Sequence, residues 1–511
     1  MKKNLRRSTR MAALFAVLVL TGSGLAACAP SSASGQATTT LTISSMLDNA
    51  SFDPADLENG HRVSFWTPLY DTLLVLTPEN TVEPGMAEAF EYDETRTVLT
   101  LTLRDDLTFS DGTALTAADV KANMEHHQQG TGQNNFMLRG AAISTPDDRT
   151  VVLTLDSPDP ALLTYLTMVA GVVAKPDGLG TDAGKDNPIA AGPYILDTKR
   201  TQRGSVYTYV RNEHYWAPED YPFEEVVVKP IPEETARLNA MRSGQVAGMA
   251  GTPQTFTEAE KAGFTVKSKP GDRVGLQIVD REGSMVPALA DKRVRQAINY
   301  AIDSDGLLRS VQQGHGARSA ELFNVESIAH VPELADAYPY DPERAKALLA
   351  EAGYADGFDI TLPQNDTDNS ATLVGQQLGD VGIRVTYRQE PTSNYVAEVQ
   401  TGRYAMFSNR VGTGDPWWDI QKHIPTTAPW NVFETVNPEL DALVATARDA
   451  VTAEEYEQGL HAVNAWLVEE AWFAPFFQAD RLYYTTTDID FDVHPQNIVP
   501  YLRDYRQAAA D

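Results

Sequence analysis

Two periods of apolar residues recur along the chain, one typical of strands and the other typical of helices. Within 99–103 every second residue is leucine and the residues between are threonine, which predicts a half-buried strand. The same alternation recurs at 151–155 and at 383–387. The run Glu-Val-Val-Val at 225–228 predicts a strand that is buried on both faces.

Helical segments lie between these strands and carry their own start and stop signals. Apolar residues at spacing i, i+3, i+4, i+7 mark the helical faces, while Thr-x-x-Asp, Thr-x-x-Glu and Asp-Pro patterns mark helix starts. These signals fall at 116–119, 294–301, 341–353, 440–447 and 452–455. The mixture predicts an α/β class of fold.

The first 27 residues have the order of a secretion signal. Five Lys or Arg residues lie within 1–10, and an apolar run from Met11 to Leu20 follows. A basic region, a short apolar run and small residues before a cleavage point are typical of a signal peptide. An apolar run of this length is too short for a permanent membrane anchor. We therefore expect residues 1–27 to be removed.

The sequence Leu-Ala-Ala-Cys at 25–28 resembles the lipobox of bacterial lipoproteins. That resemblance implies that Cys28 is lipidated and becomes the first residue of the mature chain, with 28–40 forming a lipidated N-terminus and flexible tether. Cys28 is the only cysteine, so the sequence offers no internal disulfide and no cysteine-based metal site. The alternative is a plain signal peptide with a chance cysteine.

Composition and charge exclude several classes of protein. The 511 residues are 42% hydrophobic, which is typical of a globular protein, and 70 acidic against 41 basic residues give a formal charge of −29. Nucleic-acid binding needs clustered Lys and Arg, and no such cluster exists beyond residue 10. We expect no nucleic-acid partner. An acidic chain is repelled by anionic head groups, so membrane attachment would depend on the lipid.

The sequence contains no recognisable catalytic or metal-binding pattern. The nine histidines have no metal-ligand spacing, and no nucleophile elbow, phosphate-binding loop or dinucleotide fingerprint is present. We expect no catalytic residue, no cofactor and no direct metal site, hence no enzyme. Acidic pairs are plentiful, so a secreted hydrolase remains an alternative from another class. A purely structural surface lipoprotein is another.

A series of segments shares the order of one known family. The most specific is 103–120, which fits the pattern L-R-x-x-x-x-F-x-D-G-x-x-x-x-A-x-D-V. The others are 52–54, 69–74, 83–87, 191–194, 211–216, 241–245, 291–298 and 340–354. Together they resemble the extracellular solute-binding proteins of ABC importers, family 5, the peptide/nickel type. Within the pattern we assign Phe109 to the core and Asp111-Gly112 to a tight turn, both structural roles.

The resemblance implies a two-lobe periplasmic-binding-protein-like fold, type II, of the large class with an extra subdomain on lobe I. Lobe I would comprise 41–270 and 480–511, with the extra subdomain at about 76–190. Lobe II would comprise 271–479. A ligand would bind between the lobes, which close over it.

The resemblance also implies ligand-binding residues in a segment rich in Asp, Trp and Gly at 409–419. In peptide-binding members an Asp there pairs with the α-ammonium of the peptide, and Asp415 matches better than Asp419. Asp415 has a structural alternative as the cap of a turn before Pro416. Trp417 and Trp418 cannot both point the same way, so we expect one to line the cleft and the other to enter the core.

Arg410 suggests a different cargo. In the nickel-chelate branch of the family, an arginine shortly before this aspartate holds the carboxylates of an organic chelator, and Arg suits that geometry. The alternative is an ordinary ion pair. Trp430 with Asn431, and Phe65 with Trp66, are further candidates for the ligand site, although aromatic side chains more often belong to the core.

The resulting hypothesis is a monomeric receptor that captures a peptide or peptide-like solute and delivers it to the permease and ATPase subunits of an ABC importer. The lipid on Cys28 would hold it extracytoplasmically, at the outer face of the cytoplasmic membrane or in the periplasm. Alternative cargoes for the same role are a nickel or other metal chelate, a glutathione-like molecule and an oligosaccharide.

Overall fold

The computed structural model describes residues 39–130, 134–365, 368–392 and 394–509. The chain divides into the units Met1–Ala37 and Thr38–Asp511, and the elements of the fold belong to the second. The predicted signal peptide 1–27 and the lipidation site Cys28 lie outside the described residues. So does the tether, apart from its last two residues.

The largest sheet among the described residues has nine strands. Their order is β16-β12-β17-β11-β1-β10-β9-β8, and β13 pairs with β17 beside this path. The strands are β1 (Thr40–Ser45), β8 (Tyr194–Leu196), β9 (Tyr207–Arg211), β10 (Glu225–Pro230), β11 (Gly248–Gly251), β12 (Thr265–Ile278), β13 (Gly316–Arg318), β16 (Met406–Gly412) and β17 (Ala474–Thr485). Strand β1 runs parallel to β10, whereas β12 is antiparallel to both β16 and β17.

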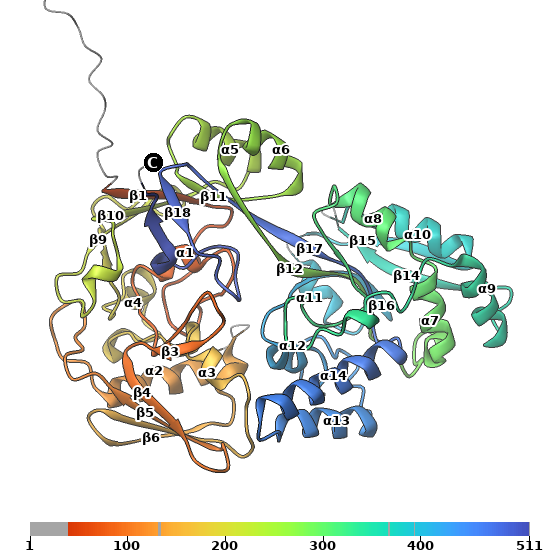
Figure 1. Ribbon diagram of the computed structural model, residues 1–511, viewed down its shortest axis with the longest axis horizontal. Helices are drawn as coiled ribbons and strands as arrows, with labels where there is room; N and C mark the ends of the chain where they lie inside the picture. Colours follow the sequence, from red (N-terminus) through yellow and green to blue (C-terminus); the bar gives the residue numbers. More distant parts are fainter. Residues whose placement is uncertain (1–38, 131–133, 366–367, 393, 510–511) are drawn as a thin grey trace, which may run out of the picture. The chain divides into compact units, whose positions relative to one another are not determined.

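Strands β12 and β17 connect two groups of elements (Figure 1). One end of the pair lies beside β11, and the other lies beside β16. The pairing shifts register between Pro270 and Asp272, which leaves Gly271 as an extra residue. Such a bulge bends a strand and re-aims the side chains beside it.

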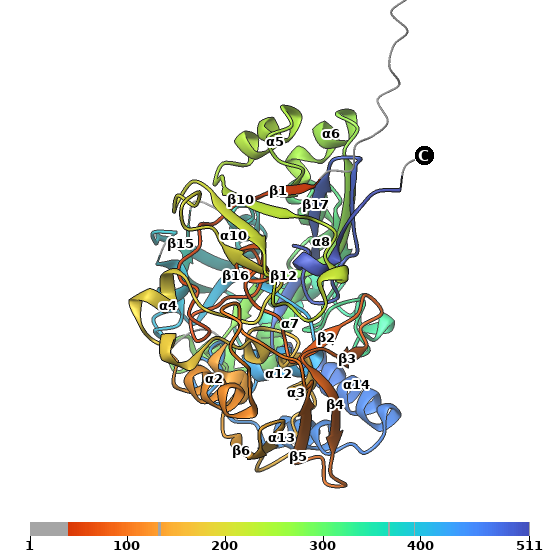
Figure 2. The same cartoon turned by 90° about the vertical axis from the view of Figure 1, so that its left-hand side faces the viewer.

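The first group precedes β12 in the chain, apart from β18 and β19. It contains an antiparallel sheet in the order β4-β5-β7-β6, with β4 (Ala87–Tyr92), β5 (Val98–Leu103), β6 (Ala142–Asp147) and β7 (Thr150–Thr154). Its other elements are β2 (Leu74–Leu76), β3 (Val82–Pro84), β18 (Ile489–Phe491), β19 (Tyr505–Gln507), α1 (Val63–Trp66), α2 (Ala117–Gln129), α3 (Leu162–Tyr165), α4 (Asp182–Asp186), α5 (Glu234–Arg242) and α6 (Pro253–Lys261). Helices α5 and α6 lie side by side in both views (Figures 1 and 2), and α5 contacts β11.

The second group lies between β12 and β17 in the chain. Its elements are β14 (Phe358–Gln364), which runs parallel to β15 (Ile383–Gln389), and the helices α7 (Lys292–Tyr300), α8 (Ser304–Val311), α9 (Pro342–Glu351), α10 (Ala371–Asp380), α11 (Tyr395–Val399), α12 (Pro416–His423), α13 (Pro438–Arg448) and α14 (Ala453–Glu469). The largest apolar core cluster contains residues of both groups, including Leu162 of α3 and Leu460 of α14.

Local sequence signals predicted most of these elements correctly. The alternating leucines of 99–103 are buried in β5, and the other two alternating segments form β7 and β15. The Asp119 carboxylate accepts hydrogen bonds from the Thr116 backbone and hydroxyl at the start of α2. Phe109 is 1% exposed, and Gly112 has φ +79° in the predicted turn.

One prediction about burial is wrong. Val226 and Val228 of β10 are fully buried, but Glu225 and Val227 are only half-buried. Glu225 pairs with Arg200 at this outer face, so the face is partly open to solvent. An acidic residue at the start of the run is consistent with one solvated face.

The helices of the part of the chain that the structure describes include none with the length and apolar character needed to cross a membrane.

Candidate functional site

A cavity of about 850 Å³ lies beside the central strands β12 and β17. Its size falls within the usual range for small-molecule sites. The first group contributes Met46, His61, Glu234, Ala250, Gly251, Thr252, Pro253, Gln254 and Ile498 to the lining. The second contributes Val311, Gln312, Asn365, Asp368, Asn369, Ser370, Thr392, Tyr395, Val396, Ser408, Asn409, Arg410 and Gly412, and the connecting strands contribute Asp272, Val274, Asp480, Arg481 and Leu482.

Two arginines in this lining share one carboxylate. The Asp272 side chain accepts from Arg410 Nε at 2.7 Å and from Arg481 Nε at 2.8 Å. Arg410 lies on β16 and Arg481 on β17, so Asp272 of β12, which follows the bulge residue Gly271, joins three adjacent strands. The cluster has one positive charge in excess. Half of the Arg410 side chain is exposed, and the residue lines the cavity.

The same charges act on their neighbours. Burial opposes ionisation of Asp272, but Arg481 and Arg410 hold the pKa of its carboxyl well below the ordinary value. Burial, reinforced by Arg481, lowers the pKa of His61 to about 4. His61 is therefore neutral at physiological pH and adds no charge to the cavity. Burial also raises the pKa of Asp480.

Several polar atoms around the cavity have no hydrogen-bond partner among the described residues. They include Asp368 Oδ2, Asn409 Nδ2 and Gln312 Oε1. Buried polar groups are almost always paired with protein, water or ligand. Asp368 uses its other oxygen to accept from Ser370 and Ala371 at the start of α10, and Oδ2 is buried without a partner among the described residues. The cavity thus offers both a positive and a negative partner.

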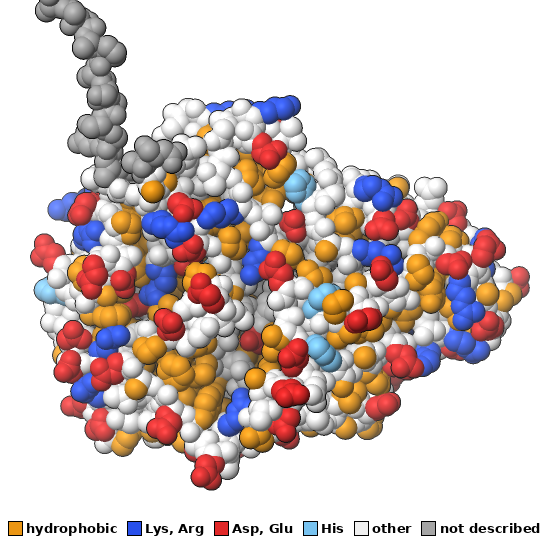
Figure 3. All heavy atoms as spheres, viewed as in Figure 1, with side chains coloured by type: hydrophobic (Ala, Val, Ile, Leu, Met, Phe, Trp, Pro, Cys, Tyr) orange, Lys and Arg blue, Asp and Glu red, His pale blue; other side chains and the backbone are white. Residues whose placement is uncertain are grey.

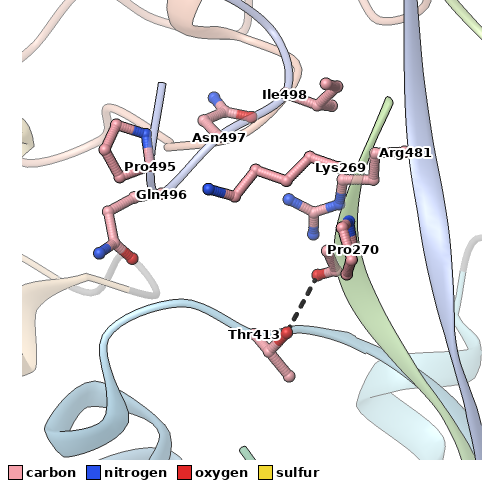
Figure 4. Close-up of a pocket in the computed structure, with 9 residues that line it drawn as sticks. Lys269, Pro270, Thr413, Arg481, Pro495, Gln496, Asn497 and Ile498 are labelled. Atoms are coloured by element: carbon pink, nitrogen blue, oxygen red, sulfur yellow. Dashed lines mark hydrogen bonds between the residues drawn. The ribbon is translucent and has the colours of Figure 1, made fainter. Parts of the chain in front are cut away.

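A small pocket adjoins this cavity and shares Arg481 and Ile498 with it. Figure 4 shows the Lys269 and Arg481 side chains extending from the paired strands toward the segment 495–498. Thr413 closes the opposite side, and its Oγ1 donates to the Gly271 carbonyl at 3.5 Å. The bulge at Gly271 therefore also positions the loop that leads to Asp415.

Asp415 is the N-cap of α12. Its Oδ1 accepts from the backbone of Trp417 at 2.8 Å and of Trp418 at 3.2 Å, which is the structural role considered for it. Its Oδ2 lies 3.4 Å from Thr164 Oγ1 of the first group. Burial raises the pKa of Asp415 to about 6.

The neighbours of Asp415 differ in how much surface they present. Trp417 and Asp419 are buried, and Asp419 pairs with Lys422 at 2.8 Å. Trp418 is half-buried and packs against the largest core cluster, with its Nε1 unpartnered among the described residues. Trp417 is 3% exposed and Trp418 is half-buried, and neither lines the cavity, so the expectation that one of them faces the cleft stays a prediction.

The remaining predicted ligand residues lie mostly in the core. Phe65 and Trp66 are 0% and 1% exposed, and Asn431 uses its amide to hold the Ile424 and Thr435 carbonyls. Trp430 is partly buried against Phe407. Direct contact with a solute would require Phe65, Trp66 and Asn431 to leave positions that are already packed.

Sequence reasoning missed most of the cavity lining. Of the predicted residues only Arg410 lines it, whereas Asp272, Arg481, His61 and Asp368 were not singled out. Their positions are scattered over the chain, and none belongs to a motif. The chain segment Pro-Gly-Asp-Arg at 270–273 contains a turn-like pair, which is a weak signal for the bulge.

The described residues offer no metal-binding cluster to the site, and acidic and basic side chains are mixed on the face drawn in Figure 3. No group of three or more His, Cys, Asp or Glu side chains within the described ranges is arranged to hold a metal ion. Figure 3 shows acidic side chains scattered over one face of the molecule, with basic ones between them. That pattern agrees with the acidic composition.

Comparisons with known proteins agree with this architecture. Residues 81–423 match the model of the bacterial extracellular solute-binding proteins, family 5. The glutathione-binding protein GsiB of Salmonella typhi is 27% identical over 363 residues, which cover 68% of this chain and 69% of GsiB.

Two solved structures extend the likeness to nearly the whole chain. The periplasmic binding protein DppA from Helicobacter pylori, in complex with the peptide STSA, has a TM-score of 0.78 and 20% identity, covering 92% of this chain and 98% of DppA. NikA from Brucella suis, in complex with Fe(III)-EDTA, has a TM-score of 0.75 and 23% identity, covering 92% and 99%. These structures confirm the predicted two-lobe periplasmic-binding-protein fold.

Proposed function

Because the chain belongs to family 5 of the bacterial extracellular solute-binding proteins, we propose that its cargo is a peptide or peptide-like solute bound in the 850 Å³ cavity. The receptor role itself follows from the family. The identity of the cargo is inferred from the chemistry of the cavity, from the peptide in the DppA complex and from the glutathione named for GsiB.

The observation that carries this proposal is the presence of free partners for both charges of a zwitterion. The guanidinium of Arg410 uses Nε on Asp272 and lines the cavity, and its terminal nitrogens can donate to a ligand carboxylate. Asp368 Oδ2 has no partner among the described residues, and Asp480 carries a second carboxylate in the same lining. A peptide with free ends supplies the complementary ammonium and carboxylate.

A metal chelate is the second candidate cargo. Arg410 supports it, because an arginine fork suits the carboxylates of a chelator, and NikA is structurally similar to this chain. The absence of a metal-holding side-chain cluster within the described residues is compatible with a metal that arrives inside its chelator. Neither the family match nor these structures support a secreted hydrolase.

Two lobes, a lipid anchor and importer partners complete the proposed receptor. Lobe I would comprise 41–270 and 480–511, with its extra subdomain near 76–190, and lobe II would comprise 271–479. Both boundaries fall inside β12 and β17, where bending would let the lobes move. The monomeric receptor would be anchored outside the cytoplasm through lipidated Cys28. It would release the solute unaltered to its permease and ATPase partners.

Calorimetry with end-blocked peptides tests the cargo and its orientation together. A series from dipeptides to octapeptides is titrated with free ends, as C-terminal amides and as N-acetyl derivatives. If Arg410 holds the ligand carboxylate, amidation weakens binding by roughly 10–100-fold, because one charged hydrogen-bond pair is lost. In Arg410→Met the same amidation has no further effect.

Arg384→Met is the matched control, since Arg384 is an exposed arginine that pairs with Asp359 away from the cavity lining. It should leave the effect of amidation unchanged. Metal–EDTA complexes, glutathione and linear oligosaccharides are titrated beside the peptides. Binding of a chelate or an oligosaccharide with no response to any peptide would contradict the proposed cargo.

A further inference from the structure

Arg281 lies buried just beyond the end of β12, with 5% of its surface exposed. Its Nε donates to the Trp472 carbonyl at 3.1 Å, whereas Nη1 and Nη2 have no hydrogen-bond partner among the described residues. Its guanidinium carbon is 4.1 Å from the centroid of the Trp472 ring. This cation–π contact offsets part of the cost of burial but supplies no acceptor to either Nη atom.

A second buried arginine lies against the same aromatic residues. Arg273 of β12 is 1% exposed and donates through Nη2 to His423 Nε2 at 3.0 Å, while its Nε is unpartnered among the described residues. His423 accepts this bond because its Nδ1 donates to the Asp419 carbonyl at 2.9 Å. The guanidinium carbons of Arg273 and Arg281 are 4.9 Å and 5.3 Å from the centroid of the Phe473 ring.

The positive charges in this region exceed the negative ones. No carboxylate among the described residues forms an ion pair with Arg273 or Arg281. The nearest acidic influence on Arg273 is Asp419, whose Oδ1 is already paired with Lys422 at 2.8 Å. Burial and the proximity of Arg273 keep the pKa of His423 well below its ordinary value, so this ring is neutral.

The two arginines do not avoid the cost of burial by losing their protons. Burial lowers the pKa of Arg273 to about 10, which still leaves it charged at physiological pH. Burial, with the like charges of Arg295 and Arg273, also lowers the pKa of Arg281, but a guanidinium stays protonated in folded proteins. Two buried charges without an ion-pair partner are strongly unfavourable, and buried charges are normally paired.

We propose that this part of the second group binds a small monovalent inorganic anion, such as chloride, at the free Nη atoms of Arg281 and within the field of Arg273. The enclosing side chains are nearly inaccessible, which favours a small and easily dehydrated ion over an organic acid. The anion would stabilise the packing of α12 on β12. Because Asp415 begins α12, the ion would support the loop beside the solute cavity without touching the solute.

Bromide replaces chloride in the direct test. Crystals of the wild-type protein grown in sodium bromide should give an anomalous peak at hydrogen-bonding distance from Arg281 Nη1 or Nη2. In solution, the midpoint temperature of thermal unfolding should be about 1–3 °C higher in sodium chloride than in sodium gluconate of equal ionic strength. This difference should saturate as the chloride concentration rises. Arg281→Met should abolish the difference between the salts.

Arg309→Met serves as the control, because Arg309 is exposed on α8 and should retain the full chloride response. If Arg281→Met fails to fold, two other measurements test the anion site. One is the bromide peak in the wild-type protein. The other is the chloride response of Arg281→Lys, which keeps the positive charge but loses the forked guanidinium. Water in place of an anomalous peak, or equal unfolding temperatures in the two salts, would overturn the proposal.

Discussion

Arg410 donates through Nε to Asp272 Oδ2 at 2.7 Å, although the two residues are 138 positions apart in the chain. The contact exists because β12 and β16 are antiparallel neighbours and because the bulge at Gly271 turns Asp272 toward the cavity. Asp272 also accepts from Arg481 of β17. One carboxylate therefore holds three central strands together and positions the arginine that we assign to the ligand.

Replacement of Asp272 should weaken the fold at this junction. Asp272→Asn leaves Arg410 and Arg481 without their shared counter-charge, and we expect the free energy of unfolding to fall by about 1–3 kcal/mol. This loss of free energy is smaller than the loss expected for a fully buried ion pair, because half of the Arg410 side chain is exposed. Urea unfolding measures the change.

The pair of Asp359 with Arg384 provides a control, since both side chains are mostly exposed. Asp359→Asn should cost less than about 1 kcal/mol. The folded-state pKa of Asp272 is depressed, so its stabilisation is present above the ordinary carboxyl pKa and is lost as pH falls. Equal unfolding midpoints for Asp272→Asn and wild type at neutral pH would contradict the structural role.

The two roles considered for Asp415 can be separated by two substitutions. Asn is as good an N-cap as Asp, so Asp415→Asn keeps the cap and removes the charge, and because burial raises the pKa of Asp415 to about 6 it should not destabilise the protein at neutral pH. Asp415→Ala also loses the bonds to Trp417 and Trp418 and should cost about 1 kcal/mol. If Asp415 holds the ligand ammonium, Asp415→Asn binds a free-ended peptide roughly tenfold or more weakly, as calorimetry would detect.

Asp368→Asn is the companion variant, because Asp368 lines the cavity and its Oδ1 also accepts from backbone N–H groups at the start of a helix. If replacing one of the two aspartates removes the effect of N-acetylation on peptide affinity, that aspartate holds the ligand ammonium. If acetylation weakens binding equally in both variants and in the wild type, neither aspartate holds the ammonium.

Asp159 should make stability depend on pH. Burial, with the nearby Asp415, raises the pKa of Asp159 to about 7. A raised carboxyl pKa contributes stability that is complete at acid pH and is lost as pH rises through about 7. We expect Asp159→Asn to equal the wild type near pH 4 and to exceed it at pH 8, by about 1.4 kcal/mol for each unit of pKa shift.

Thermal unfolding midpoints measured across this pH range test the expectation. Asn retains the acceptor for the Ala161 backbone, so the comparison isolates the charge. Asp156→Asn, at an exposed position in the same loop, should reproduce the pH dependence of the wild type. A constant difference between Asp159→Asn and the wild type at every pH would count against the raised pKa.

Gly192 lies where the chain passes close to the backbone of Leu69 and Tyr70. A Cβ at Gly192 would overlap these backbone atoms, which cannot move like the end of a flexible side chain. We expect Gly192→Ala to destabilise the protein by about 1–3 kcal/mol. Gly379 in α10 has open space at its Cβ, so Gly379→Ala should be neutral or stabilise by up to about 1 kcal/mol. Urea unfolding of both variants tests this contrast.

The sequence by itself determined the local elements of this protein. Capping at Thr116 and Asp341, the alternation of 99–103 and the turn at Gly112 all depend on residues that are neighbours in the chain, and the structure confirms them. The ordered family segments also identified the fold, because motif order over a long chain is specific. The burial of 225–228 was predicted incorrectly, since periodicity cannot tell how completely a neighbouring layer covers a strand.

Only the tertiary structure decided which side chains meet at the cavity. Asp272, Arg410 and Arg481 are brought together by long-range strand pairing, and a one-residue bulge sets where Asp272 points. Composition could not distinguish Phe65 and Trp66, which are buried, from half-buried Trp418. The physical reason is that strand register and burial arise from contacts between distant segments, whereas helix caps and alternation arise from contacts between near ones.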